Sequence, residues 1–240
     1  NGTPDGTQTL TILPTSSSIY DFAGNAASTS QSNSTVTLND QRPTVAITAV
    51  NGSNSTVSDG STTNDATLTV TFTSSASTTN FVVGDVTVSG GSLSSFSGSG
   101  TTYTATFTPS ADGATTIDVA AGAFTDASGY SNAAATQFNW TYDGTAPSLA
   151  SVTAVLTPGN DSTPSFVFSS DEAGTITTSI SEGFSTSSSA SSGNNTITFS
   201  SLSDGTYSGK TVTVTDASGN AGSVTLADFT IETVAPTASI

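Results

Sequence analysis

Cysteine and histidine are absent from the 240 residues, and so is methionine. Without histidine and cysteine the chain lacks the commonest general base and the usual thiol nucleophile, so catalysis finds no support in the composition. Without cysteine it also lacks the disulfides on which many secreted domains depend. We therefore expect a non-enzymatic protein whose domains are each long enough to bury their own core.

Basic side chains are nearly absent too. Two Lys and Arg residues stand against 18 Asp and Glu residues, which gives a formal net charge of −16. Nucleic acids and anionic membranes both attract basic patches, so neither is expected as a partner. No run of 18 apolar residues occurs, and membrane insertion is not expected either. The acidic excess instead favours divalent cations.

What the chain does contain is short stretches in which apolar and polar residues alternate. "ATLTVTFTS" (66–74), "TYTATFT" (102–108) and "QFNWTYD" (137–143) each place their large apolar side chains on one face. Turns rich in Gly, Asn, Asp and Ser separate these stretches. The pattern predicts an all-β protein built from antiparallel β-sandwiches.

A longer repeat overlies the alternation. An acidic turn, a strand and an acidic linker followed by proline occur three times, with the turns "DFAGN", "DASGY" and "DASGN". The copies of this pattern lie about one domain length apart in the sequence, which predicts tandem domains. We place the boundaries at Pro43, Pro147 and Pro236. The predicted organisation is the last strands of a truncated repeat in 1–41, complete repeats in 42–146 and 147–235, and the start of another in 236–240.

Several stretches resemble a known family. The "DGTAP" linker, the "DASGN" turn and "NDSTPSFVFSSDEAGTITT" look like the bacterial immunoglobulin-like repeats of large secreted adhesins and biofilm-associated proteins. The resemblance implies tandem immunoglobulin-like domains in a linear array, located outside the cell as part of a surface or secreted protein. It implies neighbouring repeats of the same longer chain as partners. It also implies calcium, since such repeats are similar to ones that bind this ion between domains.

The acidic residues are candidate ligands for that ion. In a sandwich of this type, linker and turn residues meet at the domain ends, where close carboxylates repel one another unless a cation neutralises them. Ca²⁺ takes six to eight oxygens in flexible geometry. The candidates at the central joint are Asp143, Asp171, Glu172, Asp216, Asn220, Asp65 and Asp112. Those at the other joints are Asp40, Asp126, Asp5 and Glu232.

The same residues have a simpler interpretation. Asp in an Asp-x-x-Gly-Asn sequence caps backbone amides and makes a good turn without any metal. If calcium does bind, the joints should differ, because Arg42 stands two residues after Asp40 and can neutralise carboxylates itself. We predict tighter calcium binding at Asp143 than at Asp40.

The expected function is that of a structural stalk segment with calcium-stiffened joints. One alternative is a module that binds glycans or a surface through exposed loops such as "SGGSLSSFSGSGTT" (89–102). Another is a subunit of a self-assembling extracellular fibre or sheath, in which other copies of the chain would be the partners.

Overall fold

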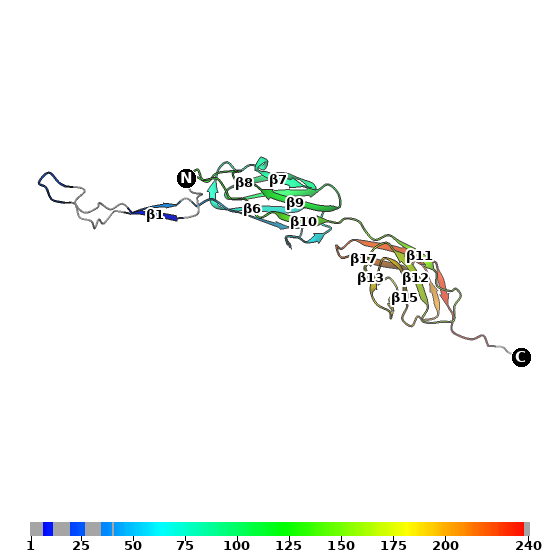
Figure 1. The fold of residues 1–240 in the computed structure, drawn as a ribbon. Helices are drawn as coiled ribbons and strands as arrows, with labels where there is room; N and C mark the ends of the chain where they lie inside the picture. The colour runs from blue at the N-terminus through cyan, green and yellow to red at the C-terminus, as the bar shows by residue number, and fades with distance from the viewer. Residues whose placement is uncertain (1–6, 12–19, 27–34, 40, 238–240) are drawn as a thin grey trace. The chain divides into compact units, whose positions relative to one another are not determined.

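The computed structural model describes residues 7–11, 20–26, 35–39 and 41–237 (Figure 1). Their regular structure consists of strands, apart from one 3₁₀ turn at Val83–Asp85, so the predicted all-β class is confirmed. Contacts divide the chain into two compact units. Unit 1 comprises Asn1–Asp59, Thr67–Thr108 and Thr116–Asn139, and unit 2 comprises Gly60–Ala66, Pro109–Thr115 and Trp140–Ile240.

The alternating apolar and polar residues of the sequence correspond to alternating buried and exposed side chains in the strands. Strand β6 (Leu68–Thr78) runs antiparallel to β8 (Gly91–Pro109), and both turn every second side chain inward. The side chains that the pattern assigned to the core are buried as expected: Leu68, Val70, Phe72, Tyr103, Ala105 and Phe107. The intervening threonines lie on the other face, which suits a pleated sheet exposed on one side.

The first sandwich has two four-stranded sheets, ordered β4-β3-β6-β8 and β5-β10-β9-β7. Neighbouring strands in the first sheet are antiparallel, whereas β5 joins β10 in parallel. The remaining strands of these sheets are β3 (Val45–Val50), β4 (Thr56–Val57), β5 (Thr62–Thr63), β7 (Val86–Ser89), β9 (Gly113–Val119) and β10 (Phe138–Tyr142). A separate antiparallel pair consists of β1 (Thr7–Thr11) and β2 (Thr35–Asn39).

An aromatic cluster fills part of this first core. Phe81 lies at its centre, with ring centroids 5.7 Å from Phe72, 5.5 Å from Phe96, 5.1 Å from Tyr103 and 4.9 Å from Phe124. Edge-on and tilted contacts of this kind stabilise by about 0.5–1.5 kcal/mol each beyond area burial.

Phe96 corrects one expectation. The segment 89–102 was interpreted as an exposed loop, but all of it except Gly90 belongs to β7 and β8. The ring of Phe96 is half-buried and contacts the rings of Phe72, Phe81 and Tyr103, so part of it packs in the aromatic cluster.

The second sandwich lies wholly in unit 2. Its sheets are ordered β11-β12-β15 and β14-β13-β17-β18, with β16 and β19 as an additional antiparallel pair. The core contains two stacked pairs of rings, Phe166 with Phe168 and Phe199 with Phe229, at centroid distances of 6.1 and 6.4 Å. The strands are β11 (Leu149–Thr153), β12 (Ser165–Ser170), β13 (Gly174–Thr178), β14 (Ser189–Ala190), β15 (Gly193–Thr198), β16 (Gly205–Tyr207), β17 (Thr211–Thr215), β18 (Ala221–Thr225) and β19 (Phe229–Ile231).

One buried amide organises the long connection between β9 and β10. Asn132 is completely buried, and its Nδ2 donates to the carbonyls of Ala120 and Ala133, each at 2.8 Å. Its Oδ1 accepts the N–H of Phe124 at 3.0 Å. Its own carbonyl accepts the N–H of Gly122 at 3.0 Å. Since both polar atoms of this side chain have partners, Asn132 can be buried without the cost of unpaired polar groups.

We expect Asn132→Ala to lower the free energy of unfolding by about 3 kcal/mol, because it removes three hydrogen bonds and leaves the N–H of buried Phe124 without its partner. Urea denaturation followed by tryptophan fluorescence measures the change. The matched control is Asn194→Ala, which removes an exposed amide and should change stability by less than about 0.5 kcal/mol. Similar losses in the two variants would contradict this account of Asn132.

Candidate functional site

The acidic turn that recurs in the sequence is a five-residue hairpin loop, and Asp216–Asn220 between β17 and β18 is its most complete example. The N–H of Asp216 donates to the carbonyl of Asn220 at 3.0 Å. In return, Asp216 Oδ1 accepts the N–H of Asn220 at 2.8 Å, and Oδ2 accepts Asn220 Nδ2 at 2.9 Å. Gly219 supplies the left-handed backbone, with φ +97°. Both carboxylate oxygens are therefore used inside the turn.

These contacts set the pKa of Asp216. Burial raises the pKa of this carboxyl, but hydrogen bonds from the side chain and N–H of Asn220 and from the N–H groups of Gly219 and Ser218 outweigh burial and leave the pKa below its ordinary value. Because the pKa of Asp216 is lower in the folded protein than in the unfolded chain, the ionised carboxylate stabilises the fold at pH values above the unfolded pKa. This stabilisation is lost as the pH falls through the folded pKa.

Asp126–Tyr130 repeats this geometry. Asp126 Oδ1 accepts the N–H groups of Ser128 and Tyr130, each at 2.9 Å. Asp21–Asn25 also repeats it, with Asp21 accepting the N–H groups of Ala23 and Asn25 at 2.9 Å. At the fifth position Asn25 donates its side-chain amide to the acid, as Asn220 does, whereas Tyr130 has no amide to donate.

Sequence inspection missed a fourth copy of the turn at Asn51–Ser55. Here Asn51 takes the place of Asp, and its Oδ1 accepts the N–H groups of Ser53 and Ser55 at 3.1 and 3.0 Å. Asn54 stands where the other copies have glycine, with φ +59°. The signal was present, because Asn is the other residue that caps its own turn and tolerates the left-handed region.

The linker that follows β10 is fixed to the rest of unit 2 at its first residue. Asp143 Oδ2 accepts the hydroxyl of Ser218 at 2.7 Å, and the Asp143 carbonyl accepts Asn220 Nδ2 at 2.8 Å. Asn220 Oδ1 in turn accepts Asn64 Nδ2 at 3.0 Å. The Asp-x-Ser-Gly-Asn turn therefore uses its third and fifth side chains to hold groups outside itself.

The next linker residues are held as well. Asp112 accepts the N–H of Gly144 at 2.8 Å and the hydroxyl of Thr145. The Thr145 hydroxyl, followed by the Gly144 N–H, keeps the pKa of Asp112 below its ordinary value. Further along, the N–H of Ser148 donates to Asp171 Oδ1 at 2.7 Å.

Pro147 in the same linker approaches β18 closely. A Cβ atom added at Gly222 would lie 1.7 Å from the Pro147 carbonyl oxygen. Only glycine fits this position, because a real Cβ never comes so close to an oxygen atom.

Glu172 feels the combined charge of the neighbouring acids. Loss of hydration raises its pKa, and the carboxylates of Asp143, Asp171, Asp216 and Asp112 raise it further, in that order. These five predicted residues therefore do gather in unit 2. Because the pKa is raised on folding, ionised Glu172 opposes folding, and the resulting loss of stability develops as the pH rises from the ordinary carboxyl value through the raised one.

The neighbouring carboxylates do not form a preorganised calcium site. Among the residues that the structure describes, no group of three or more carboxylates converges closely enough to hold a metal ion. Several of the oxygens concerned already accept protein hydrogen bonds, including both of Asp216 and both of Asp112. Six to eight oxygens around one Ca²⁺ would need a different arrangement of these side chains.

The other predicted ligands lie elsewhere. Asp65 accepts the hydroxyl of Thr63 at 2.7 Å, Asp126 caps its own turn in unit 1, and Glu232 follows β19. Asp5 and Asp40 lie outside the described residues. The expected difference in calcium affinity between Asp143 and Asp40 therefore stays a prediction.

Arg42 makes contacts that were not expected. Its Nε donates to the carbonyl of Ser131 at 2.9 Å, and its Nη2 donates to the carbonyl of Asn132 at 3.0 Å. The guanidinium therefore binds backbone carbonyls just after the Asp126 turn, a contact that its charge did not predict. Asp40 lies outside the described residues, so the expected neutralisation of carboxylates at that joint stays a prediction. Two parallel N–H groups suit two successive carbonyls, which is why Arg serves this purpose better than Lys.

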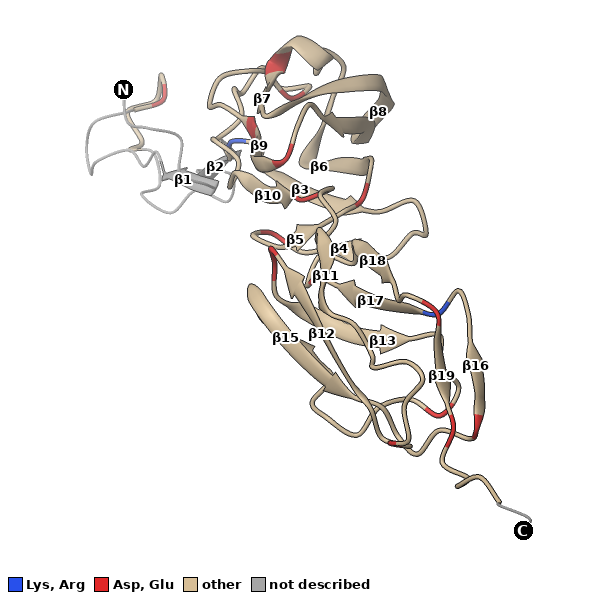
Figure 2. Cartoon of the chain, turned by 90° about the vertical axis from the view of Figure 1, so that its right-hand side faces the viewer, with Lys and Arg blue, Asp and Glu red and all other residues tan. Residues whose placement is uncertain are grey.

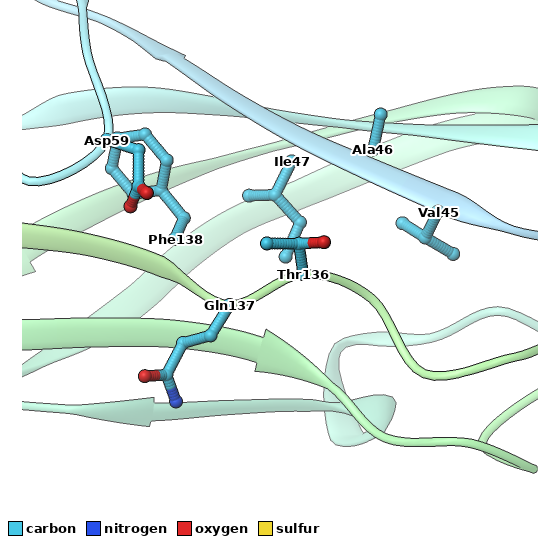
Figure 3. A pocket seen from close by; sticks show the side chains of 7 residues that line it. All are labelled: Val45, Ala46, Ile47, Asp59, Thr136, Gln137 and Phe138. Atoms are coloured by element: carbon cyan, nitrogen blue, oxygen red, sulfur yellow. The ribbon is translucent and has the colours of Figure 1, made fainter.

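A cleft of about 280 Å³ opens beside the first strand of the first sandwich, with Val45, Ala46 and Ile47 on one wall and the segment 136–138 on the other (Figure 3). Asp59 is the only titratable residue in its lining, and its Oδ1 accepts the N–H of Asn139 at 2.6 Å. A single hydrogen-bonded carboxylate without a nucleophile or second acid gives this cleft no evident chemistry.

Acidic residues are concentrated in loops and at strand ends, while the strands themselves contain few charged residues (Figure 2). Across the described ranges, no helix is long and apolar enough to span a membrane. Antiparallel sandwiches joined by side-chain-capped turns define an immunoglobulin-like class of structural domain.

Family comparison identifies the class more closely. Residues 39–142 match a family model described as a bacterial Ig-like domain, and residues 155–233 match a second model with the same description. The chain belongs to the bacterial Ig-like domains, as its repeats suggested. Domains of these families are generally non-enzymatic structural modules and are typically extracellular or surface-exposed. No curated protein matches the chain.

The need for glycine at the fourth position of the turn can be tested at Gly129, where an added side chain meets no neighbouring atoms. Gly129 has φ +86° and open space around its missing Cβ, so Gly129→Ala should cost about 1–2 kcal/mol through backbone strain alone. Gly129→Asn should cost clearly less, because Asn54 adopts this conformation in the fourth turn. Thermal and urea unfolding measure both values, and equal losses would show that backbone conformation does not limit this position.

Proposed function

We propose that the chain is a spacer segment of an extracellular bacterial repeat protein, either an adhesin or a biofilm-matrix protein. The main support for this proposal is the linker of unit 2, which is held in place by hydrogen bonds. Four of its residues, Asp143, Gly144, Thr145 and Ser148, take part in hydrogen bonds to turns of that unit, and Pro147 lies against Gly222. A linker held in this way transmits position from one repeat to the next, which a flexible tether does not.

Charge and composition fit that role. The chain contributes capped turns, a high net negative charge and a serine- and threonine-rich surface, and none of these supplies an acid–base pair or a nucleophile. A net charge far from zero keeps extended proteins soluble and discourages lateral association.

As part of this proposal, calcium binds weakly, as a counter-ion of the carboxylates around Glu172. Loss of hydration and then repulsion from the surrounding carboxylates raise the pKa of Glu172, and a divalent cation near these carboxylates would reduce their repulsion. Because the described carboxylates do not form a cage, we expect affinity toward the weak end of the range for extracellular modules, with little preference over magnesium.

Calcium should therefore raise the melting temperature of the chain, with a midpoint of about 1 mM, and magnesium should act similarly. Glu172→Gln should raise the melting temperature in the absence of calcium and should reduce the further increase that calcium gives. Glu232→Gln is the control, because this carboxylate does not belong to the group around Glu172. Tight binding that excludes magnesium would contradict the counter-ion account and would indicate a true calcium cage.

The spacer role is tested by pulling the chain from its two ends in single-molecule force spectroscopy. We expect two separate unfolding events, with length gains of roughly 30–35 nm and roughly 25 nm for the segments 39–142 and 155–233. Extension without force peaks would count against a spacer. Specific binding of the isolated chain to a glycan array would instead favour a recognition module.

A further inference from the structure

Two sets of loops in unit 2 carry matching acceptor groups. Glu232 follows β19 as Asp143 follows β10, and their backbones are held alike. The N–H of Asp143 donates to the carbonyl of Thr63 at 3.1 Å, and the N–H of Glu232 donates to the carbonyl of Gly159 at 2.8 Å. Thr63 and Gly159 each precede an Asn-Asp pair, beginning at Asn64 and at Asn160.

A second hydrogen bond confirms the correspondence. The residue after each linker acid donates its N–H to an aspartate in a Ser/Ala-Asp-Gly turn. Gly144 donates to Asp112 Oδ1 at 2.8 Å, and Thr233 donates to Asp204 Oδ1 at 3.0 Å. We name the two equivalent sets of acceptors the first rim, which is Asn64, Asp112 and Asp143, and the second rim, which is Asn160, Asp204 and Glu232.

The first rim holds an Asp-x-Ser-Gly-Asn turn. Asn64 Nδ2 donates to Asn220 Oδ1, Ser218 donates its hydroxyl to the Asp143 carboxylate, and Asn220 Nδ2 donates to the Asp143 carbonyl, all within 3.0 Å. The turn brings no positive charge to this acidic surface. Its hydroxyl and amide donors satisfy the carboxylate and carbonyl oxygens directly.

The second rim presents the same groups to solvent. Asn160 and Glu232 are exposed and line a cleft of about 540 Å³ together with the segment 233–236. Val234 in that segment is 73% exposed. Within residues 41–237, no hydrogen bond reaches the Asn160 carboxamide or the Glu232 carboxylate from another described group.

We propose that the second rim is a docking surface for the Asp-x-Ser-Gly-Asn turn of a following bacterial Ig-like repeat. In this complex the Asn160 carboxamide pairs with the turn's asparagine, Glu232 accepts the turn's serine hydroxyl, and the Glu232 carbonyl accepts the asparagine amide. The proposal rests on the spacer function only in requiring that a further repeat follows in the same longer chain.

The chemistry of the rim makes the partner specific. Serine is needed at the third position of the turn and asparagine at the fifth, because these two side chains make every polar contact with the first rim. Asp126–Tyr130 has no amide at its fifth position, and Asp21–Asn25 has alanine at its third. Neither of these two turns should dock on the second rim.

The natural absence of cysteine allows a direct test by crosslinking. The full chain is extended by repeating residues 148–237 directly after Pro236, which preserves the spacing of the linker. Cysteines are placed by Asn160→Cys and by Asn220→Cys in the repeated copy. The reference is Asn64→Cys with Asn220→Cys in the 240-residue chain. The background pair is Asn160→Cys with Asn194→Cys in the repeated copy, which reports random encounter across the linker.

We expect the test pair to form its disulfide at a rate within about tenfold of the reference pair and well above the background pair. Ser218→Ala in the repeated copy should slow the reaction. A test pair no faster than the background pair would overturn the proposal, and so would a reference pair that does not react, because the template contact would then be absent. Either failure leaves the two unfolding events expected of a spacer untouched, so the two ideas fail separately.

Discussion

Side-chain oxygens that accept hydrogen bonds from the N–H groups of their own turn hold the strand connections of both units. A chain of many short strands has many turns, and each turn leaves backbone donors that must find acceptors. Asp21, Asn51, Asp126 and Asp216 meet that need at four hairpin ends in the same way. Because the sequence contains no cysteine, these turns carry much of the local order that disulfides provide in many small domains.

The same turns then become available for a second purpose. Once Asp216 has satisfied the backbone of its loop, Ser218 and Asn220 still have donors directed away from it, and these fix the linker residue Asp143. Turn geometry and linker position are therefore coupled, and a change at Gly219 would disturb both. Most carboxylates of this unit accept hydrogen bonds from neutral amides and hydroxyls. Because these donors carry no positive charge, the unit keeps its acidic character.

The architecture of the protein could be predicted from sequence because alternation is a strong local signal. The buried faces of β6 and β8 are those that the pattern assigned to the core. The family was evident from turns and linkers that stand at fixed places in the repeat. The role of Phe96 could not be predicted, since a serine- and glycine-rich stretch with one aromatic ring is compatible with either a loop or a long twisted strand.

Longer-range contacts were harder still. Asn132 gives no periodic signal, and its importance depends on four backbone groups from a connection whose path cannot be inferred from composition. The hydrogen bonds from Arg42 to two backbone carbonyls could not be predicted either, because charge alone pointed to carboxylates. The acidic residues were expected to meet at the linker of unit 2, and the charges of four of them act on Glu172. Their hydrogen bonds to turn donors could not be read from spacing.

The scarcity of basic residues has a consequence for digestion by proteases. Proteases of the trypsin type cut after Lys or Arg, and this chain offers them only Arg42 and Lys210. Arg42 precedes Pro43, which blocks such cleavage, and its guanidinium is held by two carbonyls. Lys210 directly precedes β17, and its carbonyl accepts the N–H of Leu226 at 2.8 Å. Digestion after Lys210 would require local unfolding first, so the folded chain should resist this class of enzyme.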